Sequence, residues 1–306
     1  MNYMTTKEAS KAWSISDRRI RVLCEEGRIE GALKIGRNWS IPVDCTKPID
    51  ARVRNNDTYF GVEADFKEID DFKHEIDSYR PFSLETLASL RDNLIVEWTY
   101  NSNAIEGNTL TLSETKVVLE GITVGGKSMV EHLEAINHKA AILFLESIIQ
   151  KKENLSERNI KNIHQLILKN IDNSNAGKYR QENVLISSAK HIPPSHFAVP
   201  EMMQRLIHEY QTEWSGYHPV VRAALLHGEF VKIHPFIDGN GRTARILLNF
   251  ELMRTGYPPI VIKNQMRAQY YDALDHAHVT KDYKPFVELV VGSVMELECL
   301  WLKMVK

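Results

Sequence analysis

The sequence predicts a mainly α-helical protein with one short β-hairpin, preceded by a small N-terminal domain that combines two helices with a second hairpin. Three observations lead to this prediction. Helix-period runs of apolar residues follow one another from Leu84 to Leu302. The sole strand-like stretch after residue 50 is Asn183–Phe197. The polar segment Thr46–Asp57 interrupts the apolar periodicity, as a linker between domains does.

Length and composition are those of a folded protein. The 306 residues suffice for two domains, and 43% hydrophobic with 25% charged residues is close to average globular usage. No apolar run approaches the roughly 18 residues of a membrane span. The polar start Met1–Ser10 differs from a signal peptide, so we expect a cytoplasmic protein that binds no membrane. Cys24, Cys45 and Cys299 share no metal-ligand spacing, so we expect reduced thiols.

The charge balance excludes a field that would draw the whole molecule onto nucleic acid. The chain has 38 basic and 40 acidic side chains, a net charge of -2. Residues 1–50 contain nine Lys and Arg against seven Asp and Glu, which leaves 29 and 33 for residues 51–306. The first segment therefore carries +2 and the remainder -4, so any nucleic-acid binding must be local.

The first 45 residues have the pattern of two short helices and a hairpin. A helix begins at Thr5-Thr6-Lys7-Glu8, and a second begins at Ser16 and ends at Gly27. Two short strand-like runs, Ala32–Ile35 and Trp39–Pro42, then flank a glycine-containing turn. This arrangement favours a winged helix-turn-helix.

The stretch Thr5–Asp44, above all Lys34–Pro42, resembles the excisionase and MerR-type winged helix-turn-helix family. The resemblance implies a domain over residues 1–50 with DNA as its partner. The candidate DNA-binding residues are Arg18, Arg19, Arg21 and Arg37. The alternative is a small helical docking module whose arginines form a solvated face.

The remainder of the chain is predicted to be helical almost throughout. The helix-period runs are Leu84–Tyr100, Ser113–Leu119, Val130–Gln150, Glu157–Asn170, Pro200–Thr212, Pro219–Val231, Arg242–Arg254 and Tyr283–Leu302. In the strand-like stretch, Val184–Ile186 and His191-Ile192 surround four small or polar residues, and Pro193-Pro194 close the predicted short hairpin.

The segment His234–Arg245 carries the most informative pattern. Gly239-Asn240-Gly241 precede an apolar helix, so free backbone N–H groups and the positive end of the helix dipole favour an anion there. Arg242 and Arg245 are three residues apart in the first turn and share a face. Two forked guanidinium groups suit a polyphosphate better than a single phosphate.

Two further side chains complete the predicted site. Asp238 at the mouth of the loop can hold the Mg²⁺ that accompanies a polyphosphate. His234, kept off helix geometry by Pro235, can accept a proton from an attacking hydroxyl group when its imidazole is neutral. Neither a P-loop nor a dinucleotide-binding GxGxxG is present. The alternative is that the glycines only cap a helix and that the histidine is structural.

The same segment resembles the Fic family motif HPFx[D/E]GNGRxxR at every defined position. The resemblance implies a Fic-type helical core and an enzyme that moves AMP from ATP onto a Ser, Thr or Tyr hydroxyl of another protein. It assigns the general base to His234, the buried anchor of the loop to Phe236, the Mg²⁺ ligand to Asp238, the anion cradle to Gly239, Asn240 and Gly241, and the β- and γ-phosphate contacts to Arg242 and Arg245.

The strand-like stretch resembles the target-binding flap of the same family, beginning at Tyr179-Arg180. An exposed hairpin edge can pair with an extended target segment through main-chain hydrogen bonds. The candidate target-binding residues are Val184, Leu185, Ile186 and Ile192. An ordinary surface hairpin is the alternative.

A built-in inhibitor is indicated by Ser102–Asn108. Asn103 and Glu106 have the spacing of a capping box, which alone would mark a short helix start, yet Gly107 and Asn108 are stop residues. Glu106 would then lie at the negative end of a helix dipole and need a cationic partner. The stretch resembles the inhibitory motif [S/T]xxxE[G/N] of the Fic family. That resemblance makes Ser102, Glu106 and Gly107 inhibitory residues and pairs Glu106 with Arg245 in the place of the γ-phosphate.

The predicted organisation is a winged helix-turn-helix domain at 1–50, a helical linker region at 51–115 with an inhibitory helix around 102–107, and a Fic catalytic domain with C-terminal helices at 116–306. Two other functions stay open: a DNA-binding transcriptional regulator whose Fic core senses nucleotide, and an enzyme that removes AMP with Glu106 positioning a water. The sequence names no target protein. A homodimer is one of the oligomeric states it allows.

Overall fold

A computed structural model describes residues 3–13, 16–25, 29, 31–36, 38–43, 45, 66–186 and 189–305. The chain divides into two compact units, residues 1–55 and residues 56–306. The predicted linker Thr46–Asp57 lies outside the described residues. Among the described helices, none is both long and apolar enough to cross a membrane.

The N-terminal unit contains a three-stranded antiparallel sheet and two helices. Its elements are β1 (Tyr3–Thr5), α1 (Thr6–Trp13), α2 (Asp17–Glu25), β2 (Leu33–Ile35) and β3 (Asn38–Pro42). The sheet order is β1-β3-β2, and β2 and β3 form the predicted hairpin. The strand β1, which the sequence did not predict, pairs Thr5 with Ser40. Ala9, Ile20 and Ile41 are fully buried and form a small core.

The candidate DNA-binding arginines lie partly in α2. Arg18 and Arg21 are exposed, and Arg21 donates to Asp17 at 2.6 Å, so its charge is already shared within the helix. The side chain of Arg19 and the whole of Arg37 lie outside the described residues. A winged helix-turn-helix domain at this end stays a prediction.

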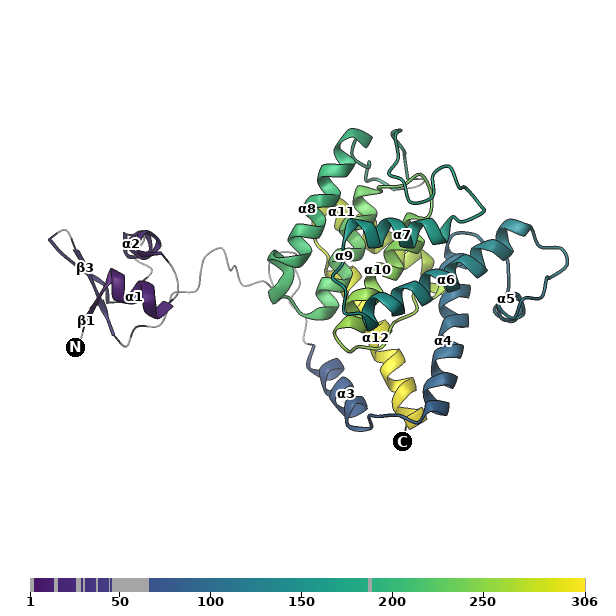
Figure 1. Ribbon diagram of the computed structural model, residues 1–306, viewed down its shortest axis with the longest axis horizontal. Helices are drawn as coiled ribbons and strands as arrows, with labels where there is room; N and C mark the ends of the chain where they lie inside the picture. The colour runs from purple at the N-terminus through teal and green to yellow at the C-terminus, as the bar shows by residue number, and fades with distance from the viewer. Residues whose placement is uncertain are drawn as a thin grey trace. The chain divides into compact units, whose positions relative to one another are not determined.

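The second unit is helical (Figure 1). Its α-helices are α3 (Lys67–Ser78), α4 (Leu84–Ile105), α5 (Leu112–Leu119), α6 (Met129–Gln150), α7 (Glu157–Ile167), α8 (Val199–Gln211), α9 (Pro219–Ile233), α10 (Asn240–Arg254), α11 (Arg267–Thr280) and α12 (Lys284–Val305). Short 3-10 helices are η2 (His196–Ala198), η3 (Glu213–Gly216) and η4 (Asn264–Met266). The prediction of a mainly helical chain is confirmed.

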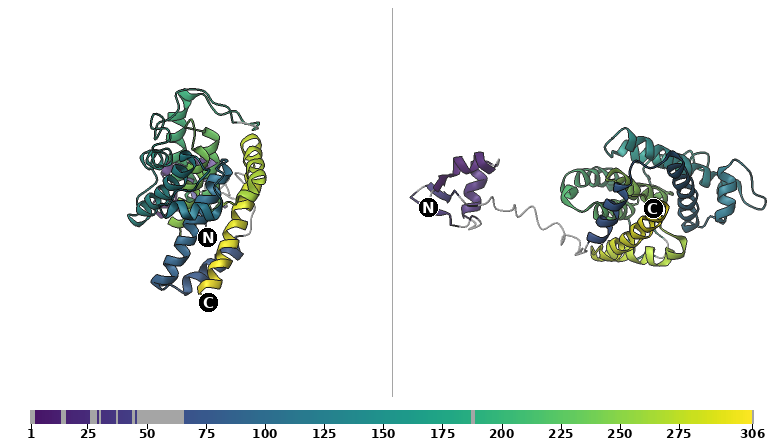
Figure 2. Two further views of the ribbon diagram at one scale, coloured as in Figure 1. Left: turned by 90° about the vertical axis from the view of Figure 1, so that its right-hand side faces the viewer. Right: turned by 90° about the horizontal axis from the view of Figure 1, so that it is seen from below.

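The helices α9 and α10 form the centre of the unit, where they pack against each other within a shell of the other helices (Figure 1). Most of their side chains are buried, including Leu225, Phe230, Ile246 and Leu248. The short loop from residue 234 to residue 239 joins them. Towards one end of the unit, α3 packs along α12 (Figure 2). The loop that carries the predicted motif is therefore anchored at both ends in the core.

The predicted helices agree with the structure within a few residues, with three differences. No separate short helix surrounds residues 102–107, because α4 continues unbroken from Leu84 to Ile105 and Glu106 is its C-cap. The structure also contains α3 and α11, which the sequence did not predict.

The predicted hairpin at Asn183–Phe197 is wrong for the described residues. None of the residues 182–186 or 189–195 forms a strand; the predicted turn residues Ser187 and Ser188 lie outside the described part of the chain. Side chains form hydrogen bonds with several backbone groups of this segment, in place of a second strand. Arg180 donates to the carbonyls of Glu182 and Pro194, and Asp275 accepts from the N–H groups of Lys190 and His191.

Candidate active site

His234 opens the loop between α9 and α10 with a strained backbone. Its φ of 51° and ψ of 59° lie in the left-handed region that side chains other than glycine rarely adopt. Gly239, at the far end of the loop, has φ 75°. Strain of this kind costs about 1–3 kcal/mol and persists where the surrounding structure imposes it, often at functional sites.

Arg180 imposes this geometry on His234. The Arg180 side chain is buried, and its Nε donates to the His234 carbonyl at 2.8 Å. The backbone N–H of Arg180 donates to the carbonyl of Pro235 at 2.9 Å. Two consecutive carbonyls of the loop are therefore fixed from a segment 54 residues earlier in the chain.

Phe236 is the buried anchor that the family resemblance implied. It is 0% exposed and lies parallel to the His164 ring at 3.6 Å between centroids. Asn240 accepts from the Phe236 N–H and donates to its carbonyl, so it closes the loop on itself. His164 supports the loop a second time, with Nε2 2.8 Å from the Asp238 carbonyl. A side chain at Gly239 would press on His164, its Cβ lying 3.3 Å from the ring.

Arg245 is held by the end of α4. Its Nη2 lies 2.6 Å from Glu106 Oε1, and the same nitrogen donates to the Ser102 carbonyl at 2.8 Å. Nε donates to Ser102 Oγ at 3.0 Å, and Nη1 to Tyr270 Oη at 3.3 Å. Burial, the largest single cause, lowers the pKa of Arg245, but Glu106 and Tyr270 together outweigh it and the pKa is raised. The structure thus brings together Glu106 and Arg245, the predicted pair, and adds Ser102, which was predicted only as an inhibitory residue.

The Glu106 carboxylate lies against the first turn of α10. A Cβ built on Gly241 would be only 2.3 Å from Glu106 Oε1, so only glycine leaves room for the carboxylate. The N-terminal end of a helix, with its free N–H groups and positive dipole end, is a natural anion site. A side-chain carboxylate of the same chain occupies that position.

The sequence suggested that Arg242 points toward an incoming anion. In the structure it is instead paired with two carboxylates. Its side chain is 3% exposed, with Nη1 2.8 Å from Glu134 Oε1 on α6 and Nη2 3.2 Å from Asp238 Oδ2. Asp238 itself is 66% exposed at the mouth of the loop, and its Oδ1 accepts from the Gly239 N–H. Asp238 belongs to the motif itself, whereas Glu134 reaches Arg242 because α6 packs against α10, which a local motif cannot show.

A pocket of about 480 Å³ opens beside these groups. His234, Glu106, Gly241, Tyr270 and Tyr271 are among its lining residues. The pocket therefore presents two predicted groups, the base His234 and the inhibitory carboxylate of Glu106, to one space next to the first turn of α10.

His234 is neutral in this environment at ordinary pH. Burial, the largest cause, lowers its pKa to about 4. The backbone of Val231 acts in the opposite direction, Arg180 lowers the pKa further, and Glu106 raises it. A neutral imidazole can accept a proton, although a base with so low a pKa holds it only weakly.

One of the four candidate target-binding residues belongs to the lining of this pocket. Ile186 lines it, whereas Leu185 and Ile192 are 80% and 70% exposed. Val184 is half-buried. Large apolar side chains this exposed are available to a partner.

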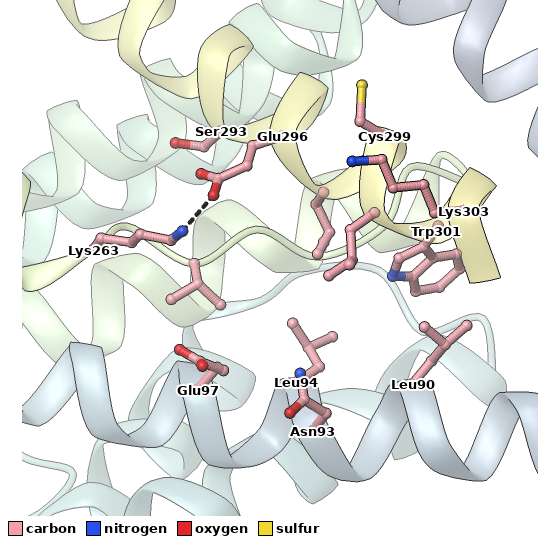
Figure 3. Close-up of a pocket in the computed structure, with 13 residues that line it drawn as sticks. Leu90, Asn93, Leu94, Glu97, Lys263, Ser293, Glu296, Cys299, Trp301 and Lys303 are labelled. Atoms are coloured by element: carbon pink, nitrogen blue, oxygen red, sulfur yellow. Dashed lines mark hydrogen bonds and ion pairs between the residues drawn. The ribbon is translucent and has the colours of Figure 1, made fainter. Parts of the chain in front are cut away.

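A second cavity, of about 390 Å³, shares no lining residue with the His234 pocket. Figure 3 shows it between α4 and α12, with Leu90 and Leu94 on one side and Trp301 on the other, and an ion pair between Lys263 and Glu296 at one end. It contains none of the predicted site residues.

Comparison with known proteins identifies the family. Residues 154–252 match the model of the Fic/DOC family. A Fic domain containing signaling protein from Bacteroides thetaiotaomicron has a TM-score of 0.72 and 32% sequence identity, covering 78% of this chain and 96% of that one. Fic-1 from C. elegans also has a TM-score of 0.72, with 31% identity, covering 78% of this chain and 71% of that one. The chain belongs to the Fic/DOC family. The predicted Fic-type core is thereby confirmed.

Relatives in this family carry a named activity. The protein adenylyltransferase Fic of Drosophila grimshawi is 41% identical over 205 residues, which cover 66% of this chain and 42% of that protein. The chain thus spans less than half the length of this relative. The Fic/DOC match includes α7, α8, α9 and the loop with most of α10.

Three residues of the site were not predicted in these roles: His164, Arg180 and Glu134. Each reaches the loop or Arg242 from another element, 54 to 108 positions away along the chain. Of the three, only Arg180 could be noticed in the sequence, because it belongs to Tyr179-Arg180, where the stretch that resembles the family's flap begins.

Proposed function

We propose that this chain is an autoinhibited protein adenylyltransferase that transfers AMP from ATP to a hydroxyl group of a target protein. One observation carries the proposal: the Glu106 carboxylate lies on Gly241 at the start of α10 and 2.6 Å from Arg245. A phosphate group of ATP is the anion that a helix N-terminus and an arginine would otherwise hold. The activity named for the Drosophila relative supports the same reaction.

The proposed reaction uses His234 as the general base. The imidazole takes the proton of the target hydroxyl while its oxygen attacks the α-phosphorus of ATP. A new O–P bond forms, the bond between the α-phosphorus and the bridging oxygen breaks, and pyrophosphate leaves. Arg245 and the N-terminal end of α10 stabilise the charge that collects on the departing phosphates. Exposed Leu185 and Ile192 would hold the target segment beside the pocket.

Asp238 has the properties of an Mg²⁺ ligand. Its carboxylate is 66% exposed, and Mg²⁺ is commonly held by one or two carboxylates with phosphate oxygens and water. Among the described residues, no group of three or more His, Cys, Asp or Glu could hold a metal ion, so the other ligands would come from ATP and solvent. When bound, Mg²⁺ would neutralise phosphate charge.

The inhibition follows from charge. While Glu106 pairs with Arg245, that arginine is not available to ATP, and a negative group occupies the place of a phosphate. Like charges at contact distance repel, so ATP can bind productively only after Glu106 has moved. Glu106 is the C-cap of α4, at the negative end of the helix dipole, so the pair with Arg245 also offsets an unfavourable position.

Labelling with α-³²P-ATP tests the proposal. Glu106→Gly should raise AMP transfer, including automodification, at least about tenfold, because a charge-assisted hydrogen bond contributes about 1.5–3 kcal/mol. His234→Ala in the same background should abolish labelling. Equal labelling by the wild type and Glu106→Gly would contradict the inhibition.

Glu120→Gly is a matched control. Glu120 is the C-cap of α5 with φ -84° and ψ 0°, nearly the backbone of Glu106 at -86° and -2°, and a glycine with positive φ follows each. Glu120 does not line the His234 pocket. A general effect of loosening a helix end would appear in both variants, whereas release of the site appears only in Glu106→Gly.

We further propose that residues 1–50 form a winged helix-turn-helix domain that binds DNA. Two short helices and a three-stranded sheet support this, together with exposed Arg18 on α2. Salt-sensitive binding of duplex DNA that Arg18→Ala weakens would test it. No effect of salt or of Arg18→Ala would favour a docking module instead.

A further inference from the structure

Arg242 and Arg245 are restrained in different ways, although both belong to the same turn of α10. Arg245 pairs with Glu106, which is 31% exposed at the end of a helix. Arg242 pairs with Glu134, which is 17% exposed in the 22-residue helix α6. The first partner lies at the C-cap of α4. The second lies within a long helix and is the less exposed of the two.

Glu134 is held at both oxygens. Oε1 accepts from Arg242 Nη1 at 2.8 Å, and Oε2 accepts from Asn108 Nδ2 at 2.8 Å. Asn108 is fixed in turn, because its Nδ2 also donates to the Glu131 carbonyl and its Oδ1 accepts from the Leu110 N–H. Glu134 therefore has one orientation, and it sets the orientation of the Arg242 guanidinium.

Arg242 uses Nη1 for Glu134, so its Nη2 remains for Asp238, whose Oδ2 lies 3.2 Å away. We propose that Glu134 is a positioning residue: it holds Arg242 so that the guanidinium steadies the exposed Asp238 carboxylate at one oxygen without covering it, and so keeps Asp238 open to Mg²⁺. This inference rests on the proposed function, since it concerns the metal and nucleotide of that site.

The charges of the site predict a measurable effect of Glu134 on how strongly Mg²⁺ improves ATP binding. With Glu106 displaced, the charges of Arg242 and Arg245 are balanced by those of Asp238 and Glu134, so this cluster has no net positive charge and we expect an ATP tetra-anion to bind better with Mg²⁺. Removing the charge of Glu134 releases Arg242 in two ways. The guanidinium can pair fully with Asp238, which weakens Mg²⁺ binding, or turn to the phosphates, which strengthens binding of metal-free ATP.

Glu134→Gln is the appropriate change. A glutamine side chain has a single acceptor oxygen, so it can satisfy Asn108 or Arg242 but not both. The full chain carrying Glu106→Gly and His234→Ala provides the background, since it has no inhibitory carboxylate and transfers no AMP. Calorimetry then gives the Kd of ATP in EDTA and in Mg²⁺, with and without Glu134→Gln.

The expected result is that the advantage of Mg²⁺, the ratio of the two Kd values, falls about tenfold or more, the usual effect of losing a residue that orients a metal ligand. Glu146→Gln is the matched control, because Glu146 holds Arg91 through two hydrogen bonds on the same helix α6 and lies outside the pocket. This variant should leave the ratio unchanged.

An equal loss of both affinities, as a merely structural role predicts, overturns the inference, and so does an unchanged ratio. If the background protein binds no ATP even in Mg²⁺, the proposed function fails before Glu134 is tested.

Discussion

Two walls border the His234 pocket, and they are built differently. One is the end of α4, a regular helix whose last carbonyls accept hydrogen bonds from Arg245 and from Tyr271 Oη. The other is the segment 182–195, whose described residues form no strand and which is fastened by Arg180 and Asp275. The first wall places a carboxylate on the site. The second places none there and exposes apolar side chains. We infer that the helix end controls nucleotide entry and that the loop supports the target.

The two walls also act in opposite directions on one imidazole. Glu106, from the helix wall, raises the pKa of His234, whereas Arg180, which fastens the loop wall, lowers it. Both effects are smaller than that of burial. A change in either wall should therefore alter the base as well as the contact it removes.

The largest effect is expected for Arg180→Met on the loop wall. The change removes the donors to the His234, Glu182 and Pro194 carbonyls and leaves an apolar side chain in the same space. His234 then loses the contact that fixes its left-handed backbone. Because a positioned general base contributes about 10²–10⁴ in rate, AMP transfer in the Glu106→Gly background should fall about 100-fold or more.

Binding of ATP distinguishes this loss from unfolding. Within the described part of the chain, Arg180 forms no hydrogen bond with Arg245 or Glu106. Because separated sites couple only weakly, the Kd of Mg²⁺-ATP should change less than about threefold. Arg180→Lys keeps the charge but loses the planar guanidinium that reaches three carbonyls. Its rate of AMP transfer should therefore lie between those of the parent protein and Arg180→Met. If the affinity for Mg²⁺-ATP and the rate of AMP transfer decline together, the two walls do not have the separate roles inferred for them.

Local patterns in the sequence were sufficient for most of the helices. The run Val130–Gln150 became α6 from Met129 to Gln150, because its apolar residues recur at the helical period. The helix α11 has the same signal, with Tyr270, Leu274 and Ala277 buried, but alanines make a weak apolar stripe among polar neighbours. The helix α3 buries only Ile69 and Ile76, two residues seven apart.

The failed hairpin shows where local preference is insufficient. Val184–Ile186 is a strand-like sequence, yet backbone groups on either side of it pair with side chains instead of with a second strand. The Glu182 carbonyl accepts from nearby Arg180, and the Lys190 N–H donates to Asp275, 85 positions away. The motif loop was predictable because its contacts are local: the Asn240 side chain pairs with both backbone groups of Phe236, four residues earlier. Glu134 and Arg180 were not, since only tertiary packing brings them to the loop.

The second prediction concerns pH. Because burial lowers the pKa of His234 to about 4, the imidazole stays neutral down to about pH 5. The kcat/KM of Glu106→Gly should therefore fall less than about twofold between pH 7.5 and pH 5.5, whereas a histidine with the ordinary pKa of about 6.5 would lose about tenfold. Removing Glu106 itself lowers the pKa of His234 further, so it strengthens the expectation.

Folding must be followed over the same range. His164 and His278 also have their pKa values lowered to about 4 by burial. Their unfolded forms bind protons more readily, so the stability they contribute is present above about pH 6.5 and is lost as pH falls toward 4. A fall in rate near pH 6.5 while the protein is still folded would show that the walls do not bury the base as described.

The smallest effect is expected for Asp275→Asn. Asp275 Oδ1 accepts from two N–H groups of the loop wall, at 2.8 and 3.1 Å, and an amide oxygen is a weaker acceptor than a carboxylate. Loosening this attachment should raise the KM for a protein target about threefold, the effect of losing roughly 0.5–1 kcal/mol. The Kd of ATP should not change, since the end of α4 and Arg245 are untouched.

Ser102→Ala is the reciprocal test on the helix wall. It removes the oxygen that accepts from Arg245 Nε at 3.0 Å but leaves the Ser102 carbonyl in place. Automodification of the otherwise wild-type chain should then rise several-fold, while the KM for a target stays constant. If Asp275→Asn changed ATP affinity, or Ser102→Ala changed the KM for the target, then both walls would serve both ligands, and a single closure of the pocket would explain the inhibition better than a carboxylate at one side.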